Sequence, residues 1–434
     1  MQGGNGCGGS GIDSNDCLPE AQKGLFDQKG LQKEITPGVA FVRYKNAIAA
    51  RQTYKGATMI LNDFNSKKLS ALGLGCMRLP LEDKDSGRID ETASAEMLDY
   101  AIKNGINYFD TAWAYHNGNS ETVMGKLLQK YPRDSFYLAS KFPGYDLSSF
   151  GKAEEIFEKQ LQKCRVDHFD FYLFHNVCEM NIDAYLDKEN GVYDYLIKQK
   201  KNGRIKHLGF STHGTLETVK RFIDAYGDAI EFCQIQLNWL DWYFQSADEK
   251  VELLNKKNIP IWVMEPVRGG RLLSLPESSK QRLSALHPDW TLAEWAFRFL
   301  QSIDGVCVTL SGMSNMKQLS ENIETYKDIK RLSDEDMSTL LDIAHRMTAK
   351  NTVPCTACSY CTAYCPKGLD IPRLIELYNE HSYSGGGFIA PMALSALEDG
   401  KKPSACVGCK SCEKVCPQRI KISEVMSDFS KMIK

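Results

Sequence analysis

The sequence predicts an α/β protein in which a (β/α)8 barrel of the TIM type is followed by a small, mostly helical domain rich in cysteine. Between about residues 59 and 331, eight short apolar runs alternate with amphipathic stretches, which is typical of βα units around a parallel sheet. Eight of the 15 cysteines lie in two equal groups within residues 355–416. We therefore assign residues 59–335 to the barrel and residues 345–434 to the cysteine-rich domain.

Residues 1–58 have weak hydrophobic periodicity and many glycine, asparagine, aspartate and lysine residues, so we expect a mostly disordered extension. The GNGCGG stretch at residues 4–9 formally matches a dinucleotide-binding fingerprint. No strand pattern precedes this stretch and no helix pattern follows it, so it is not assigned to a nucleotide.

The composition, 43% hydrophobic and 25% charged over 434 residues, is ordinary for a globular chain with one large and one small core. The formal net charge is -2 and the basic residues are scattered, so we expect no nucleic-acid partner. No run approaches the roughly 18 apolar residues of a membrane span, and no secretory signal is evident. We expect a cytoplasmic protein.

The eight predicted strands are justified by short runs rich in β-branched and aromatic residues. In chain order they lie at residues 72–77, 107–112, 136–141, 169–175, 205–211, 232–238, 259–265 and 305–311. Polar residues collect at the carboxyl ends of the second to fourth runs: Asp110 and Tyr115, then Lys141, then His175. In a (β/α)8 barrel the active site lies at that end.

The stretch FDTAWAYHNGNSE, residues 109–121, resembles the DTAxxYxxGxSE signature of aldo-keto reductases. Lys141 in ASKF and His175 in LFHN fall where that family has its other catalytic residues. The resemblance covers the whole barrel region. It implies an NAD(P)-dependent oxidoreductase whose catalytic residues are Asp110, Tyr115, Lys141 and His175.

The four residues suit carbonyl chemistry. A phenol titrates near pH 10, so Tyr115 can protonate a carbonyl oxygen at neutral pH only if a cation stabilises its phenolate. Lys141 would supply that charge, Asp110 would hold Lys141, and His175 would orient the carbonyl. Each residue alone has a structural alternative: a helix cap, a loop aromatic, a solvated lysine or a core histidine.

By the same resemblance, a nicotinamide cofactor, NADP(H) or NAD(H), lies across the barrel mouth. The residues implied at its nicotinamide end are Ser211, Gln234 and Asn238, and those around its adenosine are Ser314, Gln318, Glu321 and Asn322. Arg268 or Arg271 would meet a 2′-phosphate, which a guanidinium binds well. The substrate pocket would be walled by Trp113, His116, Trp239 and Trp242, although such tryptophans also simply pack under long loops.

The cysteine groups CTACSYCTAYCP and CVGCKSCEKVCP share one spacing, and each cysteine reappears 51 positions later. In two-cluster ferredoxins, three cysteines of such a run bind one [4Fe-4S] cluster and the fourth reaches the other cluster. The expected ligands are Cys355, Cys358, Cys361 and Cys416 for the first cluster and Cys406, Cys409, Cys412 and Cys365 for the second. A pair of zinc sites fits poorly, because a third cysteine follows two residues after each C-x2-C pair.

The two halves pose a problem of electron counting. A nicotinamide transfers two electrons as a hydride, whereas a cluster transfers one at a time, and no flavin motif is evident. We expect a carbonyl or alcohol substrate at the barrel, with electron transfer through the clusters to or from a ferredoxin or flavoprotein partner. The alternative is a nicotinamide-sensing or electron-transfer docking module with little carbonyl turnover.

Overall fold

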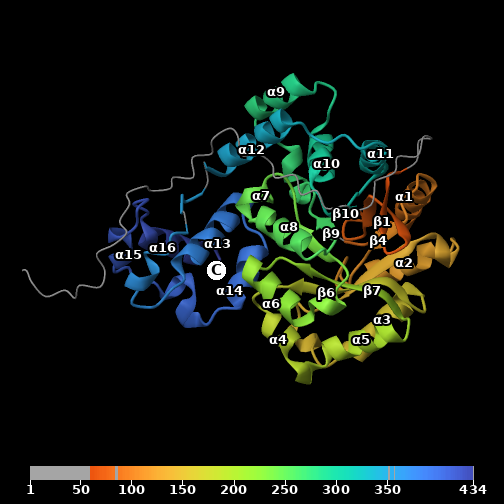
Figure 1. Ribbon diagram of the computed structural model, residues 1–434, viewed down its shortest axis with the longest axis horizontal. Coiled ribbons are helices and arrows are strands. Elements are labelled where there is room, and N and C mark those ends of the chain that lie inside the picture. The colour runs from red at the N-terminus through yellow and green to blue at the C-terminus, as the bar shows by residue number, and fades with distance from the viewer. Residues whose placement is uncertain (1–58, 84–86, 350–351, 356, 434) are drawn as a thin grey trace, which may run out of the picture. The chain divides into compact units, whose positions relative to one another are not determined.

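The computed structural model describes residues 59–83, 87–349, 352–355 and 357–433. The expectation of disorder for residues 1–58 lies outside the described residues. In chain order the described part contains a β-hairpin, a closed barrel with its helices, and a helical domain (Figure 1).

The barrel consists of eight parallel strands, and every one of the eight predicted runs supplies one of them. The strands are β3 (Leu72–Gly75), β4 (Tyr108–Asp110), β5 (Tyr137–Phe142), β6 (Phe169–Val177), β7 (Ile205–Thr212), β8 (Cys233–Gln236), β9 (Ile261–Met264) and β10 (Val306–Ser311). They pair in sequence order, and β10 closes the barrel on β3. The predicted fold class is confirmed.

Helices surround the barrel because the segments between strands are amphipathic and bury one face against it. They are α1 (Glu91–Lys103), α2 (Ser120–Leu128), α3 (Ala153–Cys164), α4 (Ile182–Leu186), α5 (Val192–Lys201), α6 (Leu216–Tyr226), α7 (Asp241–Phe244), α8 (Ala247–Lys256), α9 (Glu277–Leu286), α10 (Leu292–Ser302), α11 (Met316–Thr325) and α12 (Asp334–Ala349). Side chains of Asp90, Thr215, Thr291 and Asn315 cap the amino termini of α1, α6, α10 and α11. No helix among the described residues is long and apolar enough to cross a lipid bilayer.

A two-stranded hairpin precedes the barrel and was not predicted. Strands β1 (Leu61–Phe64) and β2 (Lys67–Ser70) pair antiparallel across Asn65 and Ser66, whose φ angles of 44° and 66° suit a tight hairpin turn. The ring of Phe64 packs at 5.1 Å from both His207 and Trp262, near the amino ends of β7 and β9. The hairpin therefore covers the amino-terminal end of the barrel.

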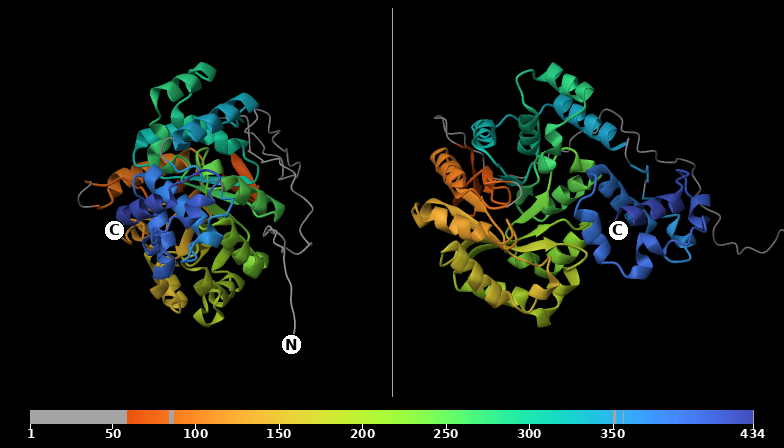
Figure 2. Two further views of the ribbon diagram at one scale, coloured as in Figure 1. Left: turned by 90° about the vertical axis from the view of Figure 1, so that its left-hand side faces the viewer. Right: turned by 180° about the vertical axis from the view of Figure 1, so that it is seen from behind.

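The cysteine-rich domain is helical, as predicted. Its helices are α13 (Ile371–Ser384), α14 (Ile389–Ser395), α15 (Ser411–Lys414) and α16 (Ile422–Met432). Asp370 caps α13 through the Arg373 N–H, and Gly385 ends α13 with a φ of 61°. Helices α13 and α16 share a core that includes Leu374, Met426 and Phe429. Figure 2 shows this domain, in blue, against the barrel from two further sides.

Short 3-10 helices lie in the loops. They are η1 (Arg133–Ser135), η2 (Leu147–Ser149), η3 (Lys188–Asn190), η4 (Gly227–Ala229), η5 (Arg268–Leu273), η6 (Thr362–Tyr364), η7 (Asp399–Lys401) and η8 (Pro403–Ala405).

Candidate functional site

Lys141 lies at the centre of the candidate site, near the carboxyl end of β5. Its Nζ lies 2.5 Å from Oδ1 of Asp110, which ends the neighbouring strand β4, and 2.9 Å from the Thr111 carbonyl oxygen. The phenol oxygen of Tyr115 is 3.3 Å from the same Nζ. Lys141 is 0% exposed and Asp110 is 2% exposed, so the ammonium and the carboxylate form a buried ion pair.

The loop that carries Tyr115 is held by buried hydrogen bonds. The Ser120 hydroxyl donates to the Cys76 carbonyl oxygen at 2.9 Å, and Lys163 Nζ donates to the Gly118 carbonyl oxygen at 3.2 Å. The carboxylate of Glu121 accepts hydrogen bonds from Ser140 and Gln160, the latter on α3. The position of Tyr115 is therefore set by contacts on both sides of the loop.

His175 reaches the same place from β6. The pairing of β6 with β7 shifts register between Phe174 and Val177, and Asn176 has a φ of 56°. Such an irregularity re-aims side chains at the end of a strand. The His175 ring lies edge-on to Tyr115 at 6.2 Å and to Tyr145 at 5.3 Å. The structure thus brings all four predicted catalytic residues together.

The protonation states follow from burial and from the ion pair. Burial opposes the charge of Lys141, but Asp110 and Tyr115 outweigh it, so the pKa of Lys141 is raised. Burial raises the pKa of Tyr115 further than Lys141 lowers it, so Tyr115 is a neutral phenol at pH 7. Burial, followed by Lys141, lowers the pKa of His175 well below 6.5, so its imidazole is neutral.

Unsatisfied polar atoms gather around this constellation. Buried polar groups in proteins are nearly always hydrogen-bonded. Five buried side-chain atoms here have no hydrogen-bond partner: Asp110 Oδ2, Tyr145 Oη, His175 Nδ1, Asn176 Oδ1 and Gln234 Oε1. Such a concentration at the carboxyl ends of β4 and β6, in β8 and in the loop after β5 is characteristic of a site that receives a polar ligand.

Of the three residues expected near the nicotinamide, only Gln234 belongs to this group, and Ser211 contacts another member of it, Asn176. The Ser211 hydroxyl, on β7, accepts the Asn176 N–H at 2.8 Å, and the Gln234 side chain reaches the Met264 sulfur at 3.7 Å. The Asn238 side chain is instead hydrogen-bonded to residues of its own loop. Its Nδ2 donates to Asp241 at 2.7 Å, and its Oδ1 accepts hydrogen bonds from two backbone N–H groups.

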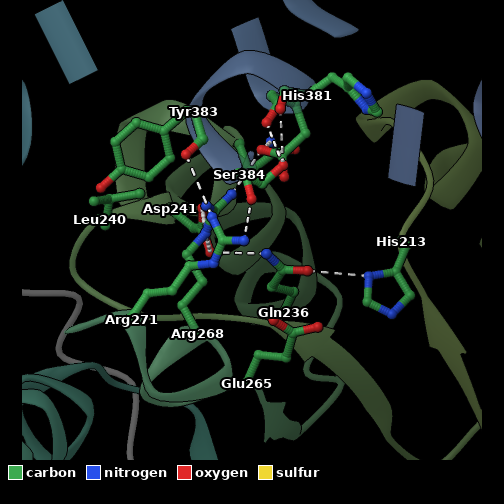
Figure 3. A network of polar contacts seen from close by, with 12 residues as sticks. His213, Gln236, Leu240, Asp241, Glu265, Arg268, Arg271, His381, Tyr383 and Ser384 are labelled. Carbon is green, nitrogen blue, oxygen red and sulfur yellow. Dashed lines mark hydrogen bonds and ion pairs between the residues drawn. The ribbon is translucent and has the colours of Figure 1, made fainter. Parts of the chain in front are cut away.

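Arg268 is likewise bonded to other side chains of the protein. Its guanidinium is 4% exposed and contacts Asp241 at 3.0 Å (Figure 3). It also contacts Glu380 of the cysteine-rich domain at 2.6 Å. Arg271 donates to the backbone carbonyl oxygens of Tyr383 and Ser384. Both arginines therefore contact the cysteine-rich domain.

The aromatic residues expected to wall the substrate pocket divide in the same way. Trp239 is 1% exposed, and Trp242 packs edge-on against Phe299 at 5.7 Å, so both serve the core. Trp113 is partly buried and lies under the Lys163 ammonium at 4.0 Å. His116 accepts the Leu79 N–H at 3.0 Å through Nε2, which occupies that ring nitrogen.

The residues expected around the adenosine line the start of α11. Ser314, Gln318 and Glu321 are exposed, whereas Asn322 is buried and donates to Ser311 at 3.2 Å. The Ser314 hydroxyl donates to the backbone carbonyl oxygen of Arg78 at 2.9 Å. Arg78, an exposed arginine beside this segment, was not predicted, because its position follows only from the pairing of β3 with β10.

The eight clustered cysteines line two cavities in the helical domain. One cavity is lined by Cys355, Cys358, Cys361 and Cys416, and the other by Cys365, Cys406, Cys409 and Cys412. Among the residues that the structure describes, no group of Cys, His, Asp or Glu side chains has the geometry to hold a single metal ion. Each cysteine group thus supplies three residues to one cavity and its last residue to the other, in the sets expected from the spacing.

Besides Arg78, two residues beside the site were not predicted from the sequence. Tyr145 lies in the loop after β5, outside the family motifs, and only its ring contact with His175 identifies it. Met392, on α14, has its Sδ 3.0 Å from Asn176 Nδ2, across 216 positions of sequence. No local pattern signals a contact of that range.

Comparisons with known proteins agree with both parts of the fold. Residues 71–345 match the model of the aldo/keto reductase family, and residues 354–421 match that of a 4Fe-4S dicluster domain. An uncharacterized oxidoreductase of Bacillus subtilis strain 168, YqkF, is 26% identical over 302 residues, which cover 63% of this chain and 92% of the relative.

Solved structures show the same barrel. An apo aldo-keto reductase from Bacillus halodurans has a TM-score of 0.52 and 25% identity, covering 66% of this chain and 96% of its own. An aldo-keto reductase from Klebsiella pneumoniae, solved in complex with NADPH, has a TM-score of 0.52 and 18% identity, covering 68% of this chain and 96% of its own. The second likeness concerns the fold alone.

Proposed function

Because the family model matches residues 71–345 of 434, the chain belongs to the aldo/keto reductase family, and we propose that it interconverts a carbonyl compound and its alcohol at Tyr115. The observation that carries this proposal is the buried Lys141–Asp110 pair next to a neutral phenol, surrounded by polar atoms without partners. A constellation of complementary groups at the carboxyl end of a barrel is a catalytic arrangement.

The residues around the site fit a nicotinamide cofactor, NADP(H) or NAD(H), which when bound supplies or accepts a hydride. Gln234 Oε1 and Asn176 Oδ1 are buried acceptors without donors, as the amide of a nicotinamide requires. Ser211 fixes the backbone of Asn176 beside them. We propose that these three residues hold that end of the cofactor.

The adenosine end is proposed to lie against the exposed side chains of Ser314, Gln318 and Glu321, with Asn322 supporting them through Ser311. Arg78, exposed beside Ser314, is better placed than Arg268 to meet a phosphate group. Asn238 and Arg268 are proposed to act indirectly, since both are bonded to Asp241 and fix the loops after β8 and β9.

The proton chemistry is proposed to belong to Tyr115. In the reduction direction its O–H donates a proton to the carbonyl oxygen, and the Lys141 ammonium at 3.3 Å stabilises the phenolate that forms. Asp110 holds Lys141 in its charged form. The neutral imidazole of His175 donates a hydrogen bond that orients the carbonyl, as the resemblance implies.

We propose that the two cysteine-lined cavities hold two [4Fe-4S] clusters, which exchange single electrons. Their donor sets are four thiols each and their walls are apolar, including Ile420 and Ile422 in one and Leu369 and Met426 in the other. We propose that these clusters exchange electrons with a ferredoxin or flavoprotein partner. A two-electron converter is needed between them and hydride chemistry.

The test is carbonyl turnover by the anaerobically purified holoprotein with NADPH and NADH over a broad panel of aldehydes and ketones. Tyr115→Phe is expected to lower the rate constant by about 10²–10⁴-fold while the iron and sulfide contents stay unchanged. Tyr193→Phe, which alters a tyrosine stacked on Tyr226 in the outer helical layer, is the matched control and should retain activity. Absence of turnover in the unaltered protein would refute the proposal and favour the sensing or docking module.

A further inference from the structure

Helix α13 of the cysteine-rich domain, here called the dicluster domain, lies across the carboxyl end of the barrel. Near its start, Arg373 lies 3.8 Å from Glu179, which follows β6. Near its end, Glu380 contacts Arg268 and Gln245, and the last carbonyl groups accept hydrogen bonds from Arg271. The helix thus spans from the loop after β6 to the loop after β9.

The contact between Glu380 and Arg268 is buried and specific. The Arg268 guanidinium donates to both oxygens of Asp241, at 3.0 and 3.1 Å (Figure 3). It also donates to Glu380, at 2.6 Å. The rings of Phe244 and Tyr383 lie 5.5 and 5.2 Å from it. Because a buried guanidinium is tolerated only with its partners in place, this contact fixes one docked position of the dicluster domain.

In that docked position, α14 adds a side chain to the barrel site. The Sδ of Met392 lies 3.0 Å from Asn176 Nδ2 and 4.0 Å from the Cys178 sulfur. The Phe388 ring contacts His213, after β7, at 5.1 Å. Asn176 directly follows His175 and carries one of the unpartnered buried oxygens, so Met392 lies at the edge of the candidate site.

We propose that Met392 of the dicluster domain is a specificity-determining residue of the barrel, forming an apolar wall against which the non-reacting part of the carbonyl substrate lies; this inference rests on the proposed function. A methionine offers a flexible, polarisable surface that suits unbranched apolar groups. The Arg268–Glu380 contact is the positioning element that keeps Met392 there. The dicluster domain therefore contributes to substrate choice as well as to electron transfer.

The docked position is tested without any turnover. Cys178 is 1% exposed, and burial raises the pKa of its thiol to about 11, so alkylation should be slow in the unaltered protein. In the anaerobic holoprotein, Glu380→Gln is expected to raise the rate of iodoacetamide labelling of Cys178 by at least about 10-fold, measured by peptide mass spectrometry. Labelling of Cys233, in strand β8, is the internal control.

The matched control variant is Glu424→Gln, which makes the same chemical change on an exposed face of α16. It should leave the labelling rate of Cys178 unchanged. Equal rates in Glu380→Gln and in the unaltered protein would overturn the docked position, provided that the iron content is the same in both.

The role of Met392 is tested by selectivity. Met392→Ala is expected to raise kcat/KM for 2-phenylpropanal relative to propanal by about 10-fold, since removing a few methylene-sized groups from a pocket changes discrimination by that order. Met392→Leu, which keeps the volume, should stay close to the unaltered ratio.

An unchanged ratio in Met392→Ala would overturn the inference while leaving the proposed function intact. Absence of turnover in the unaltered protein would instead overturn the proposed function, and with it the selectivity role, whereas the labelling of Cys178 would still decide the docked position.

Discussion

Removing the charge of Lys141 should damage stability and activity by separable amounts. In Lys141→Met the carboxylate of Asp110 stays buried without its cation, and in Asp110→Asn the ammonium stays buried without its anion. The double variant removes both charges. Comparing the three variants therefore measures how strongly the two groups depend on each other.

The size of the effect follows from the burial of the pair. With the side chains 0% and 2% exposed and 2.5 Å apart, breaking the pair from either side is expected to cost about 3–5 kcal/mol of unfolding free energy. Replacing both charges by neutral groups of similar size costs much less, because no uncompensated charge is left. We expect the double variant to be more stable than either single variant, with a coupling energy of about 2 kcal/mol or more.

The chain offers a convenient signal for this measurement. All six tryptophans lie within residues 59–335, so their fluorescence during urea unfolding reports the barrel, while the visible absorbance of the clusters reports the other domain. The double variant should regain stability yet remain inactive in carbonyl reduction, because Tyr115 lacks its cation. If the double variant lost as much unfolding free energy as the two single variants together, the reasoning would be refuted, since independent residues do not couple.

Three further outcomes are expected. Cys409→Ser should remove or convert one cluster and spare the other, as read from iron content and electron paramagnetic resonance; a variant with unchanged spectra would contradict the cavity that holds Cys409. The rate of carbonyl reduction should show no inflection near pH 6.5, because burial lowers the pKa of His175 well below that value and raises that of Tyr115 above 10; an inflection there would indicate a histidine that titrates in the site. Burial alone would raise the pKa of Glu231, but His207 and Lys200 lower it from 4.5 to about 2. After solvent screening of this half-buried carboxylate, stability on the order of 1 kcal/mol is present above pH 4.5 and lost as the pH falls toward 2. Glu231→Gln should abolish that part of the acid dependence of urea unfolding, and an unaltered pH profile would speak against the ion pairs.

The barrel and its catalytic residues were accessible from the sequence for a physical reason. Parallel strands are buried on both faces, so each appears as a short continuous apolar run, and the polar residues that interrupt the pattern mark the strand ends. The cluster ligands could be predicted equally well from the two cysteine groups, because cluster ligation requires fixed spacings. The hairpin before the barrel was missed, since half of the residues of β1 and three of the four residues of β2 are polar.

What the sequence could not disclose was the partner of each polar side chain. Arg268 was expected to meet a phosphate, but its guanidinium pairs with Glu380, 112 positions away, and such a contact has no local signature. Asn238 was expected near the nicotinamide, yet Asp241, three residues later, engages its amide. Both residue types suit a ligand or a structural contact, and only the fold decides which they meet.

The hairpin that covers the amino-terminal end of the barrel has a kinetic consequence. Phe64 packs among aromatic side chains at that end, and buried side chains such as Phe171 and Trp262 fill the barrel interior. Bound molecules can therefore enter and leave only at the opposite end, across which α13 lies. Changes in the attachment of α13 would alter the dissociation rate of bound molecules, even when the groups that perform the chemistry are untouched.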